Sequence, residues 1–237
     1  MSKVGSNNDR VRLEWIQKKI SSLPKGLKIL DAGAGELANK KNCTHLNYVS
    51  QDFCQYNGEG DSTALQTQEW DTSKIDIVSD ITSIPVENES FDVIICTEVL
   101  EHLPDPILAL KEFHRILKNN GELIITAPFC SLTHFAPYHF YSGFNKYFYT
   151  HHLSNLNFDI LEITPNGNFF EYIAQELRRT KNISKRYSRP IASFILKSIL
   201  KVNLYIFNKF NTHDKGSSEV LCYGYFVHAR KNDNLKN

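Results

Sequence analysis

The segment that most constrains the fold of this chain is Lys28-Ile-Leu-Asp-Ala-Gly-Ala-Gly-Glu36. An apolar stretch ends on Asp31, and two glycines, Gly33 and Gly35, follow before a segment that we predict to be a helix. Glycines permit a tight turn and the close approach of a ligand, and a helix N-terminus offers unpaired N–H groups to an anionic group. The segment therefore predicts a strand, a turn and a nucleotide-type cofactor site.

Short apolar stretches recur along the chain in the pattern of buried parallel strands. Asp31, Asp52 and Asp80 each end or follow one of these stretches. Because the carboxyl ends of parallel strands share one edge of the sheet, where ligands bind, we expect the three carboxylates to line a single site. The predicted strands are residues 28–30, 47–51, 75–78, 91–96, 122–127, 158–163 and 220–229.

Apolar residues at helical intervals, together with proline and glycine stop signals, predict the helices. We expect one α/β domain over residues 1–237. Two segments, 129–152 and 168–215, exceed what a minimal sheet needs and are predicted to cap the substrate side. Besides the segment after Gly35, the predicted helices are residues 9–22, 104–117 and 151–156, with two more inside 168–215.

Composition narrows the class of protein. With 237 residues, of which 41% are hydrophobic, the chain can bury a full core. A net charge of +1 gives no global field, so composition does not support nucleic-acid binding. Five scattered cysteines without a C-x-x-C pair favour reduced thiols in the cytoplasm. Residues 1–10 are polar and no apolar run reaches the length of a spanning helix, so we expect a cytoplasmic protein.

Five motifs, in this order and spacing, resemble those of class I S-adenosylmethionine-dependent methyltransferases. They are Leu30-Asp-Ala-Gly-Ala-Gly-Glu36, Asp52, Asp80-Ile81, Phe91 to Pro106, and Gly121-Glu-Leu-Ile-Ile-Thr-Ala-Pro128. Together they cover residues 25–130 or so. The resemblance implies an α/β, Rossmann-like, seven-stranded sheet of order 3-2-1-4-5-7-6, with strand 7 antiparallel, carrying helical and aromatic cap insertions.

The resemblance also implies S-adenosylmethionine as cofactor and S-adenosylhomocysteine as its product. Asp31 suits a cofactor that bears an ammonium and a sulfonium better than one that bears a pyrophosphate. Asp52 is placed to accept hydrogen bonds from ribose hydroxyls, and Asp80 with Ile81 to meet an adenine. The expected cofactor-binding residues are Asp31, Ala32, Gly33, Ala34, Gly35, Asp52, Phe53, Asp80, Ile81, Thr97, Glu98, Val99 and His102.

The segment after the fifth strand carries the candidate catalytic residues. A sulfonium already makes its methyl group electrophilic, so the enzyme must hold a nucleophile in line and, for a hydroxyl, remove its proton. We expect His139, then His134, as the base, and both histidines with Tyr138 and Tyr141 as substrate-binding residues. Packing of these histidines in an aromatic cap is the alternative. No cysteine or carboxylate stands at ligand spacing from them, so no metal is expected.

The acceptor is suggested only by a loose resemblance. Residues 139–149 and 164–172 are similar to methyltransferases of bacterial surface-polysaccharide clusters. We therefore expect methylation of a hydroxyl or phosphate-type oxygen of a sugar, nucleotide sugar or glycan precursor, with secondary-metabolite methylation second. Because Gly33 to Ala38 also satisfies the relaxed dinucleotide pattern, an NAD-dependent oxidoreductase is an alternative. A cofactor-binding scaffold without turnover is another.

Residues 178–201 contain eight basic residues and no acid, interleaved with apolar residues. One interpretation is a lid helix with solvated basic side chains; the other is an interfacial helix near anionic lipid or a phosphate-bearing substrate. The expected partners are thus a small-molecule substrate and a weak membrane-surface contact through 178–201, without nucleic acid. The sequence does not determine the oligomeric state.

Overall fold

The computed structural model describes residues 3–62, 64–67, 69–188 and 193–232. Internal contacts group the chain into two compact units. One unit combines Met1–Leu13 with Pro165–Tyr223, and the other combines Glu14–Thr164 with Gly224–Asn237. The single domain expected from the sequence stays a prediction.

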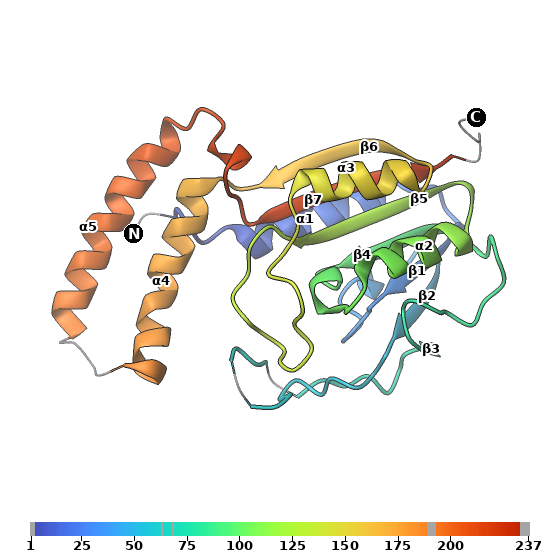
Figure 1. Cartoon of the computed structure of the whole chain (residues 1–237), viewed down its shortest axis with the longest axis horizontal. Helices are drawn as coiled ribbons and strands as arrows, with labels where there is room; N and C mark the ends of the chain where they lie inside the picture. The colour runs from blue at the N-terminus through green and yellow to red at the C-terminus, as the bar shows by residue number, and fades with distance from the viewer. Residues whose placement is uncertain (1–2, 63, 68, 189–192, 233–237) are drawn as a thin grey trace. The chain divides into compact units, whose positions relative to one another are not determined.

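The chain forms one seven-stranded sheet (Figure 1). Its strands are β1 (Lys28–Ala32), β2 (Asn47–Asp52), β3 (Ile77–Val78), β4 (Phe91–Thr97), β5 (Leu117–Pro128), β6 (Phe158–Asn166) and β7 (Gly224–Lys231). Their order is β3-β2-β1-β4-β5-β7-β6; the first five are parallel, and β7 is antiparallel to β5. The fold class, strand order and strand orientation predicted from the family resemblance are confirmed.

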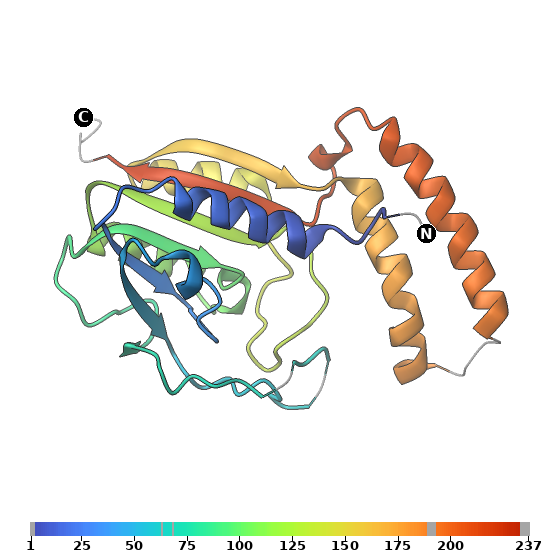
Figure 2. The same ribbon diagram turned by 180° about the vertical axis from the view of Figure 1, so that it is seen from behind.

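The helices of the described residues are α1 (Asn8–Ser21), α2 (Pro106–Ile116), α3 (Lys146–Asn155), α4 (Phe169–Tyr187) and α5 (Ser193–Thr212). Of these, α1, α2 and α3 cover the two faces of the sheet. Figure 1 shows α2 and α3 in front of the sheet, and Figure 2 shows α1 on the other face. The start of α2 is fixed by Asp105, whose Oδ1 accepts hydrogen bonds from the N–H groups of Ile107 and Leu108 at 3.1 Å. Pro106 occupies the first turn, where its missing N–H costs nothing.

The core beneath α1 shows why the predicted helical spacing succeeded. Ile16 and Ile20 are buried in one cluster with Ile29 of β1 and with residues of β4 and β5. Trp15 stacks on Phe226 of β7, with ring centroids 4.9 Å apart. The apolar stripe of this helix therefore packs across the middle strands of the sheet.

The helix predicted directly after the glycine turn does not form. Residues 33–39 are a series of turns, and only a short 3₁₀ helix, Lys40–Asn42, follows them. Leu37 adopts a left-handed backbone conformation with φ of 60°, which an α-helix cannot contain. The connection from β1 to β2 thus passes over the edge of the sheet without supplying a helix N-terminus.

Other element boundaries also differ from the predicted ones. α3 begins at Lys146 instead of residue 151, because Asn145 Oδ1 accepts hydrogen bonds from Tyr147 and Phe148 N–H and caps the helix earlier. β5 begins at Leu117 instead of residue 122, so residues 119–121 already belong to the strand. The last strand begins at Gly224 instead of residue 220.

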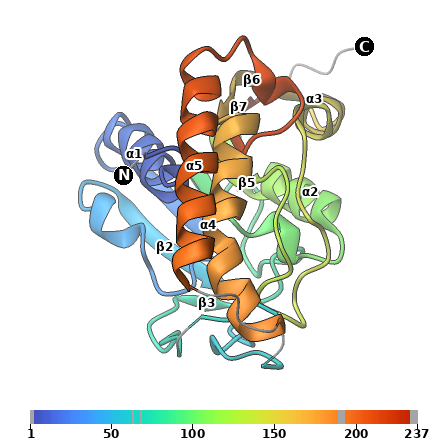
Figure 3. The same cartoon turned by 90° about the vertical axis from the view of Figure 1, so that its left-hand side faces the viewer.

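The unit formed by Met1–Leu13 and Pro165–Tyr223 contains the helical pair predicted within 168–215. In Figure 3, α4 and α5 lie side by side. Asn168 Oδ1 accepts a hydrogen bond from Glu171 N–H at 3.0 Å and caps α4, while the Phe170 ring packs on Phe210 at 5.5 Å. Within the described part of the chain, no helix is long and apolar enough to span a bilayer. A capping role for 168–215 stays a prediction.

Candidate functional site

A cavity of about 540 Å³ lies at the carboxyl ends of β1, β2, β3 and β4. This is the edge at which the sequence predicted the site, and the volume suits a small-molecule ligand. Residues from the turns after the strands form one part of its wall, and segments 53–70 and 135–140 form the rest. The lining consists of Gly33, Gln51, Asp52, Phe53, Gln55, Tyr56, Trp70, Val78, Ser79, Asp80, Ile81, Glu98, Val99, His102, Leu103, Pro104, Phe135, Tyr138 and Phe140.

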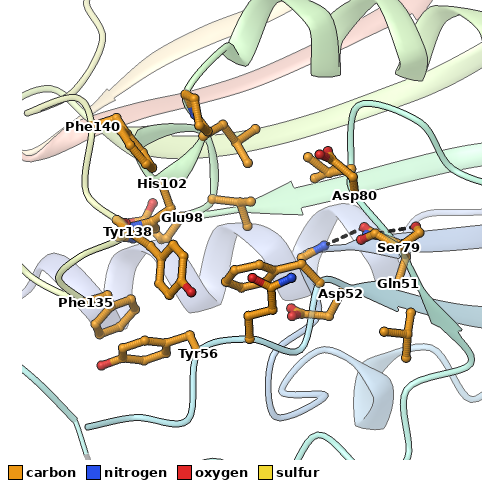
Figure 4. A pocket seen from close by; sticks show the side chains of 18 of the residues that line it. Gln51, Asp52, Tyr56, Ser79, Asp80, Glu98, His102, Phe135, Tyr138 and Phe140 are labelled. Atoms are coloured by element: carbon orange, nitrogen blue, oxygen red, sulfur yellow. Dashed lines mark hydrogen bonds between the residues drawn. The ribbon is translucent and has the colours of Figure 1, made fainter. Parts of the chain in front are cut away.

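Polar side chains gather on one side of this cavity, at the ends of β2 and β3 (Figure 4). Gln51 donates through Nε2 to the Ser79 carbonyl at 2.7 Å, which ties the two strand ends together. Asp80 is exposed, and its Oδ1 accepts from the N–H and the hydroxyl of Thr82 at 2.8 Å. The Asp80 carboxylate is thereby fixed in orientation on the cavity wall.

The Asp52 carboxylate also forms hydrogen bonds that stabilise the glycine turn after β1. Its Oδ2 accepts the Gly35 N–H at 2.9 Å and its Oδ1 accepts the Cys54 N–H at 2.9 Å. The Gly33 and Ala34 N–H groups both donate to the Gln51 carbonyl at 2.9 Å. The N–H groups of this turn are therefore engaged by β2, and the carboxylate at the end of β2 sets the position of the turn.

The turn after β4 closes against the glycine turn. Glu98 has a left-handed backbone with φ of 56°, and its carboxylate accepts a hydrogen bond from the Thr126 hydroxyl at 2.9 Å. Such a conformation in a residue other than glycine costs energy and persists where neighbouring contacts impose it. It places Val99 so close to Gly33 that a Cβ on this glycine would lie 2.4 Å from a Val99 methyl group.

Aromatic side chains gather opposite the carboxylates. Tyr56 and Phe135 stack at 4.8 Å between centroids, and the Trp70 ring meets both edge-on at 5.0 and 5.3 Å. The two segments that carry them are joined by backbone pairing: the Phe135 N–H donates to the Leu65 carbonyl at 3.0 Å. The polar stretch after Asp52 thus folds over the strand edge and, with the segment after β5, builds an apolar wall.

Asp31 does not face this cavity. Its side chain is buried, with 1% of the residue exposed, and Oδ2 accepts a hydrogen bond from the Tyr48 hydroxyl at 2.8 Å. Asn39 Nδ2 donates to both carboxylate oxygens at 3.3 Å. Burial raises the pKa of Asp31 to about 6, and the hydrogen bonds from Tyr48 and Asn39 act in the opposite direction. The Asp31 carboxylate therefore links β1 to β2 and to the turns that follow β1.

Replacing Tyr48 with phenylalanine is expected to destabilise the fold in a pH-dependent way. Because the folded state raises the Asp31 pKa from 3.8 to about 6, the stability that this group contributes is present at low pH and is lost as pH rises through about 6. Above that value the Tyr48 hydroxyl solvates a charge, so Tyr48→Phe should cost about 1.5–3 kcal/mol near pH 8 and less near pH 4. Urea unfolding at both pH values measures the difference.

The control for this experiment is Tyr147→Phe, because the Tyr147 side chain is largely exposed on α3. It should leave the unfolding free energy within about 0.5 kcal/mol at both pH values. A Tyr48→Phe penalty that was equal at the two pH values would contradict the assignment of a charged Asp31 near neutrality.

Three histidines meet at the wall of the cavity. The His102 ring lies 4.7 Å from the His134 ring and 5.8 Å from the His139 ring, and it stacks on Phe135 at 5.0 Å. His139 Nε2 lies 3.1 Å from the Ser131 hydroxyl. Burial, followed by the nearby His134, lowers the pKa of His139 below its usual value, so its imidazole is neutral near pH 7 and able to accept a proton.

The structure brings part of the predicted site together. The predicted residues that line the cavity are Gly33, Asp52, Phe53, Asp80, Ile81, Glu98, Val99, His102 and Tyr138. The predicted residues outside the lining are Asp31, Ala32, Ala34, Gly35, Thr97, His134, His139 and Tyr141. Their proposed roles stay predictions, and those outside the lining would act by supporting the residues that form it.

Sequence reasoning missed a group of lining residues. They are Gln51, Gln55, Tyr56, Trp70, Val78, Ser79, Leu103, Pro104, Phe135 and Phe140. One signal was available: Tyr56 and Trp70 are large aromatic residues inside an otherwise polar stretch, and solvated loops seldom carry them. For the others, the sequence offers no pattern that separates a cavity wall from ordinary packing.

Comparison with known proteins finds a family model that matches part of this chain. Residues 30–125 match the family model described as a methyltransferase domain. A ubiquinone biosynthesis O-methyltransferase of Actinobacillus pleuropneumoniae is 31% identical over 123 residues, which cover 49% of this chain and 51% of that protein. One of Pseudomonas putida is 25% identical over 223 residues, covering 89% of this chain and 80% of that protein. The chain thus spans about half the length of the first of these relatives.

Solved structures share the fold. A SAM-dependent methyltransferase from Archaeoglobus fulgidus superposes with a TM-score of 0.58 at 16% sequence identity. The match covers 97% of this chain and 96% of that one. At this identity the similarity establishes a common architecture, and the properties of the cavity have to be argued from the residues of this chain.

Proposed function

Because residues 30–125 belong to the methyltransferase domain family and the chain has its class I fold, we propose that this protein transfers a methyl group from S-adenosylmethionine to an oxygen of a small molecule. One observation carries the proposal: the cavity at the strand edge has two oriented carboxylates on one side and aromatic rings on the other. This arrangement offers hydrogen-bond acceptors to a polar cofactor and an apolar surface to an acceptor ring.

The residues of the cavity fit S-adenosylmethionine by the chemistry of their donor set. Asp52, at the end of β2, would accept hydrogen bonds from ribose hydroxyls, and Asp80 with Ile81 would hold the adenine. Gly33 would allow the amino-acid end to approach the backbone. When bound there, the cofactor supplies an electrophilic methyl group. The rings of Tyr56, Trp70 and Phe135 would exclude water from that region.

The glycine turn argues against the dinucleotide alternative. A dinucleotide site of the G-x-G-x-x-G type uses the N-terminus of a helix to hold the pyrophosphate. In this chain turns follow Gly33, and the Gly33 and Ala34 N–H groups donate to the Gln51 carbonyl. The carboxylates of Asp52 and Asp80 would also repel the negative charges of a pyrophosphate. These features favour a cofactor without phosphate groups.

A base for the acceptor proton is available from the histidine cluster. We keep His139 as the first candidate, because its lowered pKa leaves the ring neutral near pH 7. His139 lies outside the cavity lining, but its ring lies 5.8 Å from the ring of His102, which lines the cavity. We therefore propose that His139 removes the acceptor proton indirectly, through the side chains between it and the cavity. Positioning of the acceptor would contribute most of the rate enhancement.

The acceptor proposed here is a hydroxyl on a ring. Two classes of acceptor share this chemistry, a phenolic ring and a sugar, and both stack on aromatic side chains such as Tyr138 and Phe140. Similarity to ubiquinone biosynthesis O-methyltransferases supports the phenolic class. The resemblance of residues 139–149 to polysaccharide-cluster enzymes supports the sugar class. Secondary-metabolite methylation is kept as a further alternative.

Calorimetric titration of the purified chain tests the cofactor. We expect binding of S-adenosylmethionine and S-adenosylhomocysteine and none of NAD, with a matching rise in melting temperature for the two sulfur ligands only. A folded protein that bound NAD and ignored S-adenosylhomocysteine would reverse the choice between a methyltransferase and an oxidoreductase. Binding of neither ligand would end the proposal.

Methyl transfer from labelled S-adenosylmethionine tests the acceptor class. One arm uses catechol and related phenols, and the other uses bacterial glycan precursors and nucleotide sugars. Label on the phenols alone would assign the phenolic class, and label on the sugars alone would assign the class expected from the sequence. Cofactor binding without transfer to either set would favour the scaffold interpretation over an enzyme.

Exposed side chains of α5 support the predicted membrane contact. Of the segment 178–201, residues 189–192 lie outside the described residues. On α5, Phe194 is 72% exposed and Val202 is 59% exposed, and Lys197 and Lys201 are exposed beside them. Further exposed apolar side chains on the same helix are Ile195, Ile199, Tyr205, Ile206 and Phe210. We propose that this face of α5 binds the surface of an anionic bilayer.

Cosedimentation with vesicles tests the proposed lipid contact. Binding to phosphatidylcholine vesicles that contain phosphatidylglycerol should exceed binding to phosphatidylcholine alone, because each lysine near an anionic surface contributes about 1 kcal/mol. Lys197→Ala/Lys201→Ala and Phe194→Ser/Val202→Ser should each reduce binding by about tenfold or more. The control is Leu13→Ser, which removes an exposed apolar residue from α1. Equal binding by all variants would contradict the assignment.

A further inference from the structure

A cluster of metal-ligating side chains lies beside the cavity. Glu101 and His102 come from the 3₁₀ turn Leu100–His102 that follows β4, and His134 comes from the segment after β5. One ligand atom from each of the three lies within 4.8 Å of the others. His102 Nε2 is 3.7 Å from Glu101 Oε1. Glu101 and His102 are adjacent, but His134 lies far from them in the sequence, which is why the spacing led us to expect no metal.

Hydrogen bonds to the backbone orient both imidazoles. His102 Nδ1 lies within hydrogen-bonding distance of the Tyr138 carbonyl, and His134 Nδ1 lies 2.8 Å from the Leu132 carbonyl. A carbonyl oxygen only accepts, so each Nδ1 carries the proton and each Nε2 presents a lone pair. This is the arrangement of histidines that bind a metal, in which the second ring nitrogen donates to a carbonyl and fixes the ring.

Charge and burial in the cluster also favour a cation. Glu101 is fully buried, and a buried carboxylate is costly unless an opposite charge compensates it. Within the described part of the chain, His102 Nε2 is buried without a hydrogen-bond partner.

We propose that Glu101, His102 and His134 bind a divalent transition-metal ion. Two imidazoles and one carboxylate are the ligand set of open zinc sites and of mononuclear iron sites, which keep at least one position for a further ligand. His102 lines the cavity, so the cluster borders the ligand space. This inference rests on the proposed function in one respect: the further ligand would be the acceptor's hydroxyl oxygen, whose pKa a bound cation lowers.

Metal binding is tested on the full chain after dialysis against a chelator. Calorimetric titration with Zn²⁺, and with Co²⁺ followed by its visible absorption, should give one ion per chain. Glu101→Gln and His134→Ala should each weaken binding at least tenfold. The control His151→Ala removes an exposed histidine of α3 that contacts Asn155 and should bind the ion as the wild type does. Wild-type affinity in both cluster variants, or no binding by the folded wild type, would overturn the metal site.

Two further measurements separate this inference from the proposed function. Titration of each variant with S-adenosylhomocysteine reports on folding and on the cofactor site without the metal. If metal binds and S-adenosylhomocysteine does not, the proposed function fails and the metal site stands; the reverse result removes only the metal site. Catechol added to the Co²⁺-loaded chain should shift the visible band, and an unchanged band would overturn coordination of the acceptor oxygen.

Discussion

Gly33→Ala is expected to weaken S-adenosylhomocysteine binding by about 100-fold, close to 3 kcal/mol at 1.4 kcal/mol per factor of ten. Gly33 lines the cavity with φ of 74°, a conformation that costs an alanine about 1–2 kcal/mol. Its added Cβ would also lie 2.4 and 2.8 Å from the two methyl groups of Val99. Because Val99 lines the same cavity, relief of this overlap must displace a residue of the site.

Gly26→Ala supplies a matched control for the backbone cost alone. Gly26 has φ of 81°, and a Cβ there would meet no atom within 4 Å. The Gly26→Ala variant should therefore have a lower unfolding free energy, because of backbone strain, and an unchanged affinity for S-adenosylhomocysteine. The double variant Gly33→Ala/Val99→Ala removes both overlapping methyl groups and should recover part of the affinity, as a double-mutant cycle measures. Equal affinities for Gly33→Ala and Gly26→Ala would show that close approach at Gly33 is unimportant.

Asp52→Ala is expected to weaken cofactor binding by about 10- to 150-fold, from the loss of charged hydrogen bonds of about 1.5–3 kcal/mol. The variant would lose the proposed ribose acceptor and would leave the Gly35 and Cys54 N–H groups without the carboxylate that now receives them. Asp52→Asn retains one acceptor oxygen of the same shape and should fall between the wild type and the alanine variant. Calorimetry with S-adenosylhomocysteine gives the three affinities.

Asp76→Ala is the control that separates binding from loop support. Asp76 Oδ2 accepts hydrogen bonds from the N–H of Ser50 at 2.9 Å and from its hydroxyl at 2.7 Å, so it supports β2 in a similar way. It does not line the cavity. We expect a lower unfolding free energy and an unchanged cofactor affinity. If Asp76→Ala lost as much affinity as Asp52→Ala, the effect would belong to the position of β2 and the role of Asp52 as a ligand would be refuted.

The elements that sequence patterns predicted well are those whose cause is local. Asp105 and Pro106 mark the start of α2 by capping and by a fixed φ, and both signals are contained in adjacent residues. Ile16 and Ile20 mark the buried face of α1 through their spacing. The helix predicted after Gly35 failed because the motif resembles one in other proteins, whereas Leu37 and the residues after it adopt turns in this chain.

The sequence by itself determined the strands of the sheet and the edge that carries Asp52 and Asp80, because an apolar strand followed by an acid is a local pattern. The strand order followed from the resemblance of these motifs to a known family. Only the tertiary structure decided which carboxylate faces the cavity. Asp31 is buried, and it accepts hydrogen bonds from Tyr48 on the neighbouring strand and from Asn39 in the turns after β1. The aromatic wall and the histidine cluster join residues from segments far apart in the chain, and their approach depends on loop conformations that no local spacing encodes.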